Sequence, residues 1–324
     1  MADGIDGSVW NMQIVVTGGA GFIGSNLVRK FISQGDQVTV VDNFSTGTIR
    51  NIEGTGARIV EGSILDPSVL DAALEGSDCV VHLAARPSVP KSILDPMASH
   101  EANATGTLQV LESARRCGRP QVIVASSSSV YGSNPVIPKS EDLMPMPISP
   151  YAVSKLATES YAISYKKCFN LDTLAFRFFN VYGPFQRADH DYAAVIPAFL
   201  SAALAGRPLP VYGDGLQTRD FTYVGTVVEI LSMAAHGRVS ADGPVNLAFG
   251  TRASLLDLVG EIERALGRSL ECLHLESRPG DVRDSQADQT RLIELFGMVQ
   301  PTSLSVGLEE TIEWFRQDLS QEPK

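Results

Sequence analysis

Short apolar runs alternate with amphipathic stretches through the first half of the chain. The strand-like runs cover residues 13–17, 37–41, 57–61, 79–83, 121–125 and 172–177. Helical patterns fill the intervals, beginning with one over about 23–33 that follows a glycine-rich turn. Near-continuous apolar strands separated by helices are typical of a parallel sheet covered on both faces. The pattern therefore predicts an α/β fold built around such a sheet.

The regular alternation stops after Tyr182. Prolines and glycines then interrupt the pattern, at Pro184, Pro197, Gly206, Pro208, Pro210, Gly213 and Gly215. Because these residues break helices and strands, they indicate a smaller second region. We expect a flexible lead-in at residues 1–12 and a first domain at 13–181, to which residues of about 220–250 contribute. The second region then comprises residues 182–219 and 251–324.

The composition is that of an ordinary globular protein, and it argues against several partners. The 324 residues include 26 Lys and Arg and 37 Asp and Glu, which gives a net charge of −11. No basic face or tail stands out, so we expect no nucleic-acid partner. No apolar run approaches membrane-spanning length, and the four cysteines form no C-x-x-C pair. We expect a reduced cytoplasmic protein with no membrane association and no bound metal, since the histidine spacing matches no metal site.

A glycine-rich turn follows the first predicted strand and opens the first predicted helix. Gly18 would permit the tight turn, Gly21 would let the backbone approach a pyrophosphate, and Gly24 would allow close packing of helix on strand. A purely structural turn is the alternative. Asp42 ends the second strand, where a carboxylate can bind both ribose hydroxyls of adenosine and repel a 2′-phosphate. The combination predicts NAD rather than NADP as a cofactor.

A second signal is a helix start at residues 149–155. Ser149 can cap the helix and Pro150 suits its first position, which sets Tyr151 and Lys155 on one helix face. For Tyr151 to act as a base near neutrality, its pKa must fall by about 3 units, or roughly 4 kcal/mol. One ammonium at ~4 Å supplies about that much at an effective dielectric of ~20. The alternative is an ordinary surface Tyr and Lys on an amphipathic helix.

Four consecutive serines, residues 126–129, follow the predicted strand at 121–125. Ligands of open α/β sheets bind at the carboxyl ends of the strands, so these hydroxyls should face the same site. A serine-rich loop without a function is the alternative for this run taken alone.

Together these motifs resemble the extended short-chain dehydrogenases/reductases of the NAD-dependent epimerase/dehydratase family, and specifically the UDP-sugar 4-epimerases. The resemblance runs from about Gln13 to the end of the chain and includes residues 42–47, 82–85, 103–107, 177–184, 213–221 and 278–281. It implies a Rossmann-type doubly wound parallel sheet with a smaller mixed α/β substrate-binding region. It also implies an NAD-dependent isomerase that inverts C4 of a UDP-hexose through a transient 4-keto sugar.

The resemblance assigns catalytic roles to three residues. Tyr151 corresponds to the base, Lys155 to the lysine that holds the nicotinamide ribose and lowers the pKa of the phenol, and Ser127 to the hydroxyl that bridges the sugar O4 and the phenol. The NAD site is implied at Gly18, Gly21, Phe22, Ile23, Gly24, Asp42, Asn43, Ser45, Thr46, Gly47, Ser63, Ile64, Leu83, Ala84, Ala85, Asn103, Tyr151, Lys155, Phe178 and Val181. Ser63 departs from the family, which usually has Asp at this adenine contact.

A nucleotide-sugar site is implied as well, with two arginines facing the diphosphate through charge-assisted bonds. Its residues are Ser88, Ser127, Ser128, Tyr151, Asn180, Arg187, Ala194, Val195, Val211, Tyr212, Arg219, Arg278, Asp281 and Ser285. Ser285 corresponds to a gate beside the sugar's C2 substituent, where a small side chain leaves room for an N-acetyl group. We therefore expect both UDP-GlcNAc/UDP-GalNAc and UDP-Glc/UDP-Gal as substrates.

Arg187 leaves a UDP-glucuronate 4-epimerase open as an alternative. A similar arginine faces the C6 carboxylate in those enzymes, although they usually have Thr where this chain has Asn180. A solvated loop cation is the other interpretation of Arg187. Dehydratases and decarboxylases of the family place an acidic residue just after the bridging hydroxyl, whereas this chain has Ser128 and Ser129.

A non-catalytic NAD-binding regulator is the alternative from another functional class, but such proteins typically lose the Tyr or the Lys. The resemblance also implies a homodimer, formed by helices near residues 98–117 and 151–168. Apolar side chains at Leu108, Leu111, Tyr161 and Ile163 are compatible with that interface and equally with an internal core.

Overall fold

The computed structural model describes residues 11–188, 193–276 and 283–321. Its centre is a seven-stranded sheet in the order β11-β6-β5-β4-β1-β2-β3, in which all neighbours are parallel. The strands are β1 Gln13–Thr17, β2 Gln37–Asp42, β3 Arg58–Glu61, β4 Cys79–His82, β5 Gln121–Ser127, β6 Thr173–Phe178 and β11 Val245–Leu247. The order reverses between β1 and β4, which makes this a Rossmann-type doubly wound sheet, as predicted.

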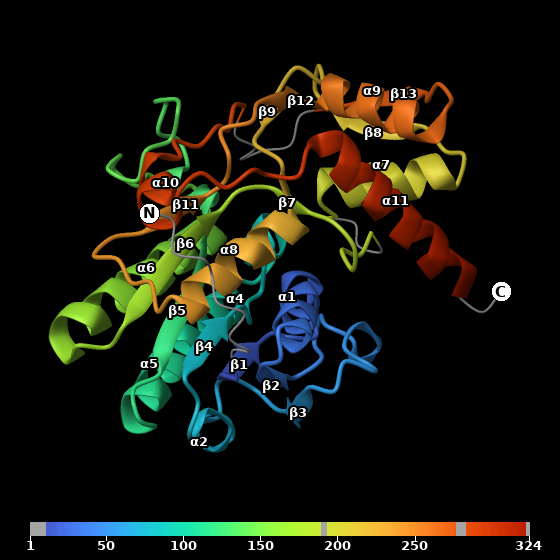
Figure 1. Ribbon diagram of the computed structural model, residues 1–324. Helices are drawn as coiled ribbons and strands as arrows, with labels where there is room; N and C mark the ends of the chain where they lie inside the picture. The colour runs from blue at the N-terminus through green and yellow to red at the C-terminus, as the bar shows by residue number, and fades with distance from the viewer. Residues whose placement is uncertain (1–10, 189–192, 277–282, 322–324) are drawn as a thin grey trace, which may run out of the picture.

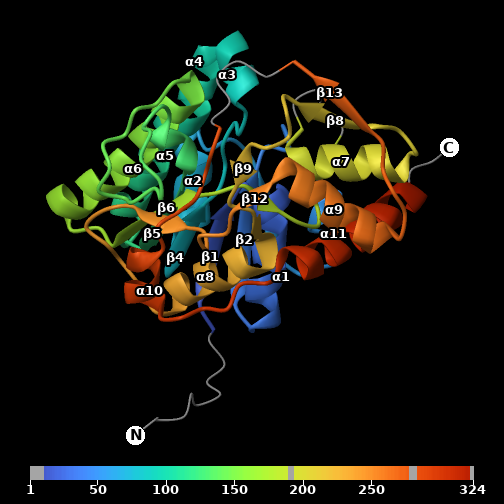
Figure 2. The ribbon, with the colours of Figure 1, turned by 90° about the horizontal axis from the view of Figure 1, so that it is seen from above.

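Helices cover both faces of the sheet, as Figures 1 and 2 show. On one face pack α2 Pro67–Leu74, α5 Gly106–Arg116 and α6 Pro150–Phe169, and on the other α1 Phe22–Ser33 and α8 Val224–His236. Alternate strand residues supply the two cores. In β1, Ile14 and Val16 pack on the α1/α8 side, whereas Val15 packs on the α2/α5/α6 side.

The connection from β4 to β5 consists of several short helices. These are α3 Val89–Leu94, α4 Pro96–His100 and a π-helical turn, Glu101–Thr105, that leads into α5. The side chains of Ser88 and Asp95 accept hydrogen bonds from the first turns of α3 and α4. Two 3₁₀ turns, Ile49–Asn51 and Ser128–Tyr131, follow β2 and β5. The turn after β5 begins directly at the carboxyl end of that strand.

The second region lies beside the main sheet (Figure 1). The described residues form three small sheets in this region or at its border with the first domain. The pairs are β8 Leu209–Tyr212 with β13 Cys272–Leu275, β9 Thr218–Arg219 with β12 Ala253–Ser254, and β7 Val181–Tyr182 with β10 Thr222–Tyr223. The helices α7 Val195–Leu204, α9 Leu255–Leu266 and α11 Leu304–Gln321 cover them, while α10 Thr290–Phe296 packs against β11. The predicted mixed α/β character of this region is confirmed.

Several absences hold for the part of the chain that the structure describes. None of its helices is both long and apolar enough to span a membrane. Within the same residues, no group of three or more His, Cys, Asp or Glu side chains could hold a metal ion. The four cysteines are free thiols. Of the expected lead-in, residues 1–10 lie outside the described residues.

Candidate active site

A cavity of about 760 Å³ opens at the carboxyl ends of the sheet strands. Its lining comes from the turn after β1, the end of β2, the segments after β4 and β5, the start of α6 and the segment after β6. This is the place where the strand order reverses, between β1 and β4. Open α/β sheets bind their ligands at such a position.

The turn formed by Gly18, Gly21 and Gly24 lines the cavity as a concave backbone surface, here called the glycine cradle. Gly18 has a φ of +70°, and a Cβ there would lie 2.6 Å from the backbone nitrogen of Ala84. A Cβ on Gly24 would collide with the carbonyl oxygen of Gly18. At Gly21, by contrast, the nearest atom would be the Gly18 oxygen at 3.2 Å, and Gly21 lines the cavity. Gly21 therefore leaves open space for a ligand, whereas Gly18 and Gly24 are required by packing.

The N-terminus of α1 faces this cradle without a side-chain cap. Gly21 is the N-cap residue, and no side chain accepts a hydrogen bond from the first turn. Phe22, Ile23 and Gly24 all line the cavity. Free N–H groups at a helix start, together with the helix dipole, form a binding site for an anion such as a pyrophosphate.

Asp42 presents a fixed carboxylate at the other side of the cradle. One oxygen accepts the backbone N–H of Ala20 at 3.0 Å and the other accepts that of Phe44 at 2.9 Å. The residue is 8% exposed and lines the cavity, beside Ser45 and Thr46. Each carboxylate oxygen retains acceptor capacity, so the pair can receive two hydroxyl groups of a ribose. The cradle and this carboxylate together fit an adenine dinucleotide without a 2′-phosphate.

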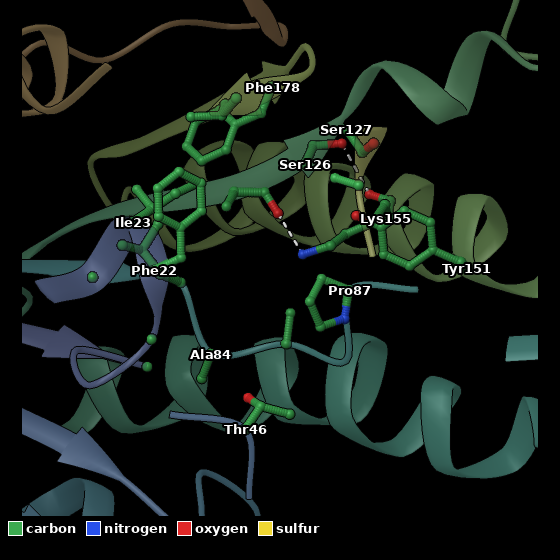
Figure 3. Close-up of a pocket in the computed structure, with 18 of the residues that line it drawn as sticks. Phe22, Ile23, Thr46, Ala84, Pro87, Ser126, Ser127, Tyr151, Lys155 and Phe178 are labelled. Atoms are coloured by element: carbon green, nitrogen blue, oxygen red, sulfur yellow. Dashed lines mark hydrogen bonds between the residues drawn. The ribbon is translucent and has the colours of Figure 1, made fainter. Parts of the chain in front are cut away.

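The start of α6 brings Tyr151 and Lys155 into the cavity wall, one helical turn apart (Figure 3). Ser149 caps the helix as predicted, because its Oγ accepts the N–H of Ala152 at 3.1 Å. The backbone N–H of Tyr151 is bound by Ser92 Oγ at 3.1 Å, which joins α6 to α3. The two side chains are therefore fixed by local helix geometry and by a tertiary contact.

The electrostatics of this pair differ from the expectation. Burial raises the pKa of Tyr151, and a hydrogen bond with Ser127 only partly opposes the rise. Lys155 Nζ donates to the carbonyl oxygen of Ala125 at 2.7 Å, and burial lowers the pKa of Lys155 to about 8. Removing the phenol from water outweighs its hydrogen bond. The protein alone therefore does not produce the lowered Tyr151 pKa that the sequence argument required.

A buried ion pair supports these residues from behind. Arg177 binds both carboxylate oxygens of Glu159, at 2.6 and 3.0 Å, and both side chains are 3% exposed. Ser126 Oγ donates to the same carboxylate at 2.6 Å and lies 3.2 Å from the carbonyl oxygen of Lys155. These bonds join the end of β5 to α6 next to the candidate catalytic residue Lys155. Ser127 Oγ in turn accepts bonds from Ser129.

The buried carboxylate of Asp220 supports the part of the cavity that Arg219 and Ser285 line. Asp220 accepts hydrogen bonds from Thr251 Oγ1 at 2.9 Å and from the backbone N–H of Ala287 at 3.0 Å, and burial raises its pKa to about 6. Its carbonyl oxygen accepts Asn180 Nδ2 at 3.2 Å. Arg219 precedes Asp220 in the chain, and Ala287 lies two residues after Ser285. The Asp220 carboxylate therefore joins the segment that carries Arg219 to the segment that carries Ser285.

Most of the predicted site residues line this cavity or a contiguous one. The larger set is Gly18, Gly21, Phe22, Ile23, Gly24, Asp42, Asn43, Ser45, Thr46, Ser63, Ile64, Leu83, Ala84, Ala85, Ser127, Ser128, Tyr151, Lys155, Phe178, Asn180, Val181, Arg187, Ala194, Arg219 and Ser285. Ser88, Val195 and Tyr212 line an adjoining cavity of about 830 Å³, which shares Asn180, Ala194 and Arg219 with the first.

Three predicted residues lie outside both linings, each for a packing reason. Gly47 packs on the glycine turn, where a Cβ would come within 2.7 Å of Ala20. Asn103 is buried and accepts the N–H of Arg86 at 2.7 Å, which ties it to the segment after β4. Val211 is fully buried in the core. Arg278 and Asp281 lie outside the described residues.

Sequence reasoning missed several residues of the lining. Pro87, Lys139, Gln186 and Asp284 all line the main cavity. Pro87, Gln186 and Asp284 adjoin predicted residues in the chain, and that adjacency could have identified them. Lys139 belongs to a segment that carries none of the recognised motifs.

Comparison with known proteins agrees with this geometry. The profile of the "NAD dependent epimerase/dehydratase family" matches residues 14–248. A UDP-glucose 4-epimerase of Mycolicibacterium smegmatis is 36% identical over 94% of this chain and 99% of its own length.

Two solved structures are similar over nearly the whole chain. One is a UDP-N-acetylglucosamine 4-epimerase from Methanobrevibacter ruminantium in complex with UDP-N-acetylmuramic acid, with a TM-score of 0.90, 35% identity and coverage of 95% and 99% of the two chains. The other is a UDP-glucuronic acid 4-epimerase from Bacillus cereus in complex with UDP-glucuronic acid and NAD, with a TM-score of 0.87, 33% identity and coverage of 94% and 99%.

Proposed function

The chain belongs to the NAD-dependent epimerase/dehydratase family, and from that premise we propose that it inverts C4 of UDP-hexoses. It is an NAD-dependent isomerase, like its 4-epimerase relatives. The proposed substrates are UDP-GlcNAc/UDP-GalNAc and UDP-Glc/UDP-Gal. The observation that carries the proposal is the meeting of Tyr151, Lys155 and Ser127 in one cavity with the glycine cradle.

The chain's own residues hold NAD in this proposal. The N-terminus of α1 binds the pyrophosphate above Gly21, Asp42 binds the adenosine ribose, and Lys155 binds the nicotinamide ribose. When bound, NAD would accept hydride from the sugar C4, would give it back to the opposite face of the 4-keto sugar, and would place a positive charge near the phenol. That charge would oppose the rise that burial causes in the pKa of Tyr151.

Tyr151 moves the proton of the sugar O4 in the proposed reaction. Its phenolate takes that proton during oxidation of C4, and the phenol returns it after the 4-keto sugar has presented its opposite face. Ser127, which is hydrogen-bonded to the phenol, bridges the phenol and O4. Arg219 holds the diphosphate, about which the sugar rotates. The stereocentre is inverted without net oxidation.

The cavity lining argues against elimination or decarboxylation. Those reactions need an acid or base beside the bridging hydroxyl. Ser128 and Ser129 occupy these positions, and Ser129 Oγ donates to Ser127 Oγ at 2.9 Å. Among the described lining residues, the carboxylates are Asp42, at the ribose end, and Asp284, which accepts Thr218 Oγ1 at 2.6 Å.

The direct test is conversion of UDP-GlcNAc to UDP-GalNAc by the purified protein, followed by NMR. We expect turnover in the wild type and its loss in Tyr151→Phe, which keeps the ring but lacks the proton-transferring oxygen. Equal activity in Tyr151→Phe would overturn the assignment. Tight NAD binding without turnover of any UDP-sugar would instead favour the non-catalytic regulator.

The substrate range is proposed from Ser285, which lines the cavity and donates its backbone N–H to the Thr218 carbonyl oxygen at 3.1 Å. A serine at this gate leaves room for an N-acetyl group. Ser285→Tyr should therefore abolish turnover of UDP-GlcNAc while UDP-Glc is still converted, and unchanged turnover of both would contradict the gate. UDP-glucuronate is the second candidate substrate, because Arg187 lines the same cavity.

We also propose a division of labour in the chain and a homodimer. Residues 13–181, with about 220–250, bind NAD, whereas 182–219 and 251–324 bind the nucleotide sugar.

The dimer would form over α4, α5 and α6, where Met97, Val153 and Tyr161 are exposed. Leu111 is fully buried in the protein's own core and is unavailable to a partner. Light scattering of the purified protein would give its molecular mass and test the dimer. We propose that the protein acts in the cytoplasm.

A further inference from the structure

Lys139 is a buried lysine in the wall of the active-site cavity. The residue is only 4% exposed, and it lines the cavity together with Ser128, Ser129 and Ser285. Lysine is almost never buried to this degree unless a carboxylate neutralises it, because removing an ammonium from water is costly.

The described residues provide no such carboxylate. Lys139 Nζ donates to the carbonyl oxygen of Asn134, which uses one of its three N–H groups. Glu141, two residues further along, accepts the N–H of Asn246 at 2.8 Å. Asp284 of the cavity lining is ion-paired with an arginine at 3.2 Å. Burial lowers the pKa of Lys139.

The position of Lys139 is set by its backbone. Its N–H donates to the Gln286 carbonyl oxygen at 2.8 Å, and the residue forms a parallel β-bridge with Ala287. The gate residue Ser285 directly precedes Gln286. Lys139 is thus joined to the segment that carries the gate, and it shares the cavity lining with Ser128 and Ser129. The proposed function assigns both segments to the sugar.

We propose that Lys139 is a specificity-determining residue that binds the carboxylate of an acidic UDP-sugar in this cavity. An ammonium with two further N–H donors and no carboxylate partner among the described residues is matched by an anion of the substrate, since charge-assisted bonds are the strong ones. A hydroxymethyl group at C6 would leave the charge uncompensated. The proposal rests on the proposed C4 epimerase and extends its substrates to uronic acids.

The test uses UDP-glucuronic acid and UDP-glucose, which differ only in a carboxylate or a hydroxymethyl group at C6. The quantity of interest is the ratio of kcat/KM for the acid to kcat/KM for the neutral sugar, measured with NAD-loaded protein. Lys139→Met should lower this ratio about tenfold or more, because a charge-assisted contact is lost from the acid alone. Lys167→Met, at the exposed end of α6, should leave it within about threefold and controls for net charge.

Stability and binding give further decisive outcomes. Replacing an uncompensated buried ammonium by an apolar side chain should leave the melting temperature of Lys139→Met unchanged or raise it. A lower melting temperature together with an equal loss of kcat/KM for both sugars would overturn the proposal in favour of a purely structural role. An unchanged ratio, or wild-type protein that does not bind UDP-glucuronic acid, would also overturn it. If the wild type turns over neither of these sugars nor UDP-GlcNAc, the proposed function fails. Calorimetric binding of UDP-glucuronic acid and UDP-glucose to the wild type and to Lys139→Met then still tests Lys139.

Discussion

The buried Arg177–Glu159 ion pair offers a sharp test of how the active site is supported. In Glu159→Gln the guanidinium would keep its position but lose its counter-charge, in a place where both side chains are 3% exposed. Arg177 already has one buried nitrogen, Nη1, without a hydrogen-bond partner. Breaking such a pair on one side typically costs about 3–5 kcal/mol. That is a large part of the ~5–15 kcal/mol that stabilises a typical domain.

The assay is urea unfolding of the wild type and Glu159→Gln, with the double variant Glu159→Leu/Arg177→Met as the matched control. Removing both charges should recover at least half of the lost free energy of unfolding, because no unpaired charge remains. The kcat of Glu159→Gln should fall as well, since Ser126 joins Glu159 to the backbone of Lys155. A loss below about 1 kcal/mol in the single variant would refute the reasoning.

Three other predictions concern the cofactor cradle and the catalytic lysine. Asp42→Ala should weaken NAD binding about tenfold to a hundredfold in calorimetry, because the ribose hydroxyls lose a charged acceptor. It should also reduce the ratio of the NADP to the NAD dissociation constant, because the carboxylate no longer repels a 2′-phosphate. Gly24→Ala should abolish retention of NAD through purification, judged from the absorbance of released nucleotide, because its Cβ would collide with the Gly18 oxygen. The pKa of Lys155 is about 8 in the folded protein and ~10.4 unfolded, so the unfolded chain binds more protons between these values. Unfolding free energy should therefore rise across that window by on the order of 3 kcal/mol more than in Lys155→Met.

The fold could be predicted from the sequence because buried parallel strands are nearly continuous apolar runs. The run at 13–17 matches β1 residue for residue, and Ser149 caps α6 as its sequence indicates. The small strands β7, β9, β10 and β12 have only two residues each, which is too short for any periodic pattern. The π-helical turn at Glu101–Thr105 carried no sequence signal that we recognised.

Most of the candidate site followed from motifs whose chemistry requires particular residues, such as the glycine cradle and Asp42. Gly47 and Asn103 belong to recognised motifs yet lie outside the lining of both cavities, where Gly47 packs on the glycine turn and Asn103 is buried. A motif does not distinguish a residue that contacts a ligand from one that packs behind it. The direction of the Tyr151 pKa shift was beyond sequence reasoning as well, because it depends on burial and on where the Lys155 ammonium is bound.

The central claim is that C4 is inverted by transient oxidation, with Tyr151 moving only the O4 proton. The most direct measurement is epimerisation of UDP-GlcNAc in D₂O, with deuterium at C4 of the product determined by mass spectrometry and NMR. The account predicts that the original hydrogen returns to C4 and that no solvent deuterium appears there. Substantial deuterium at C4 would mean that C4 exchanges its hydrogen with water as a proton, and it would contradict the proposed reaction.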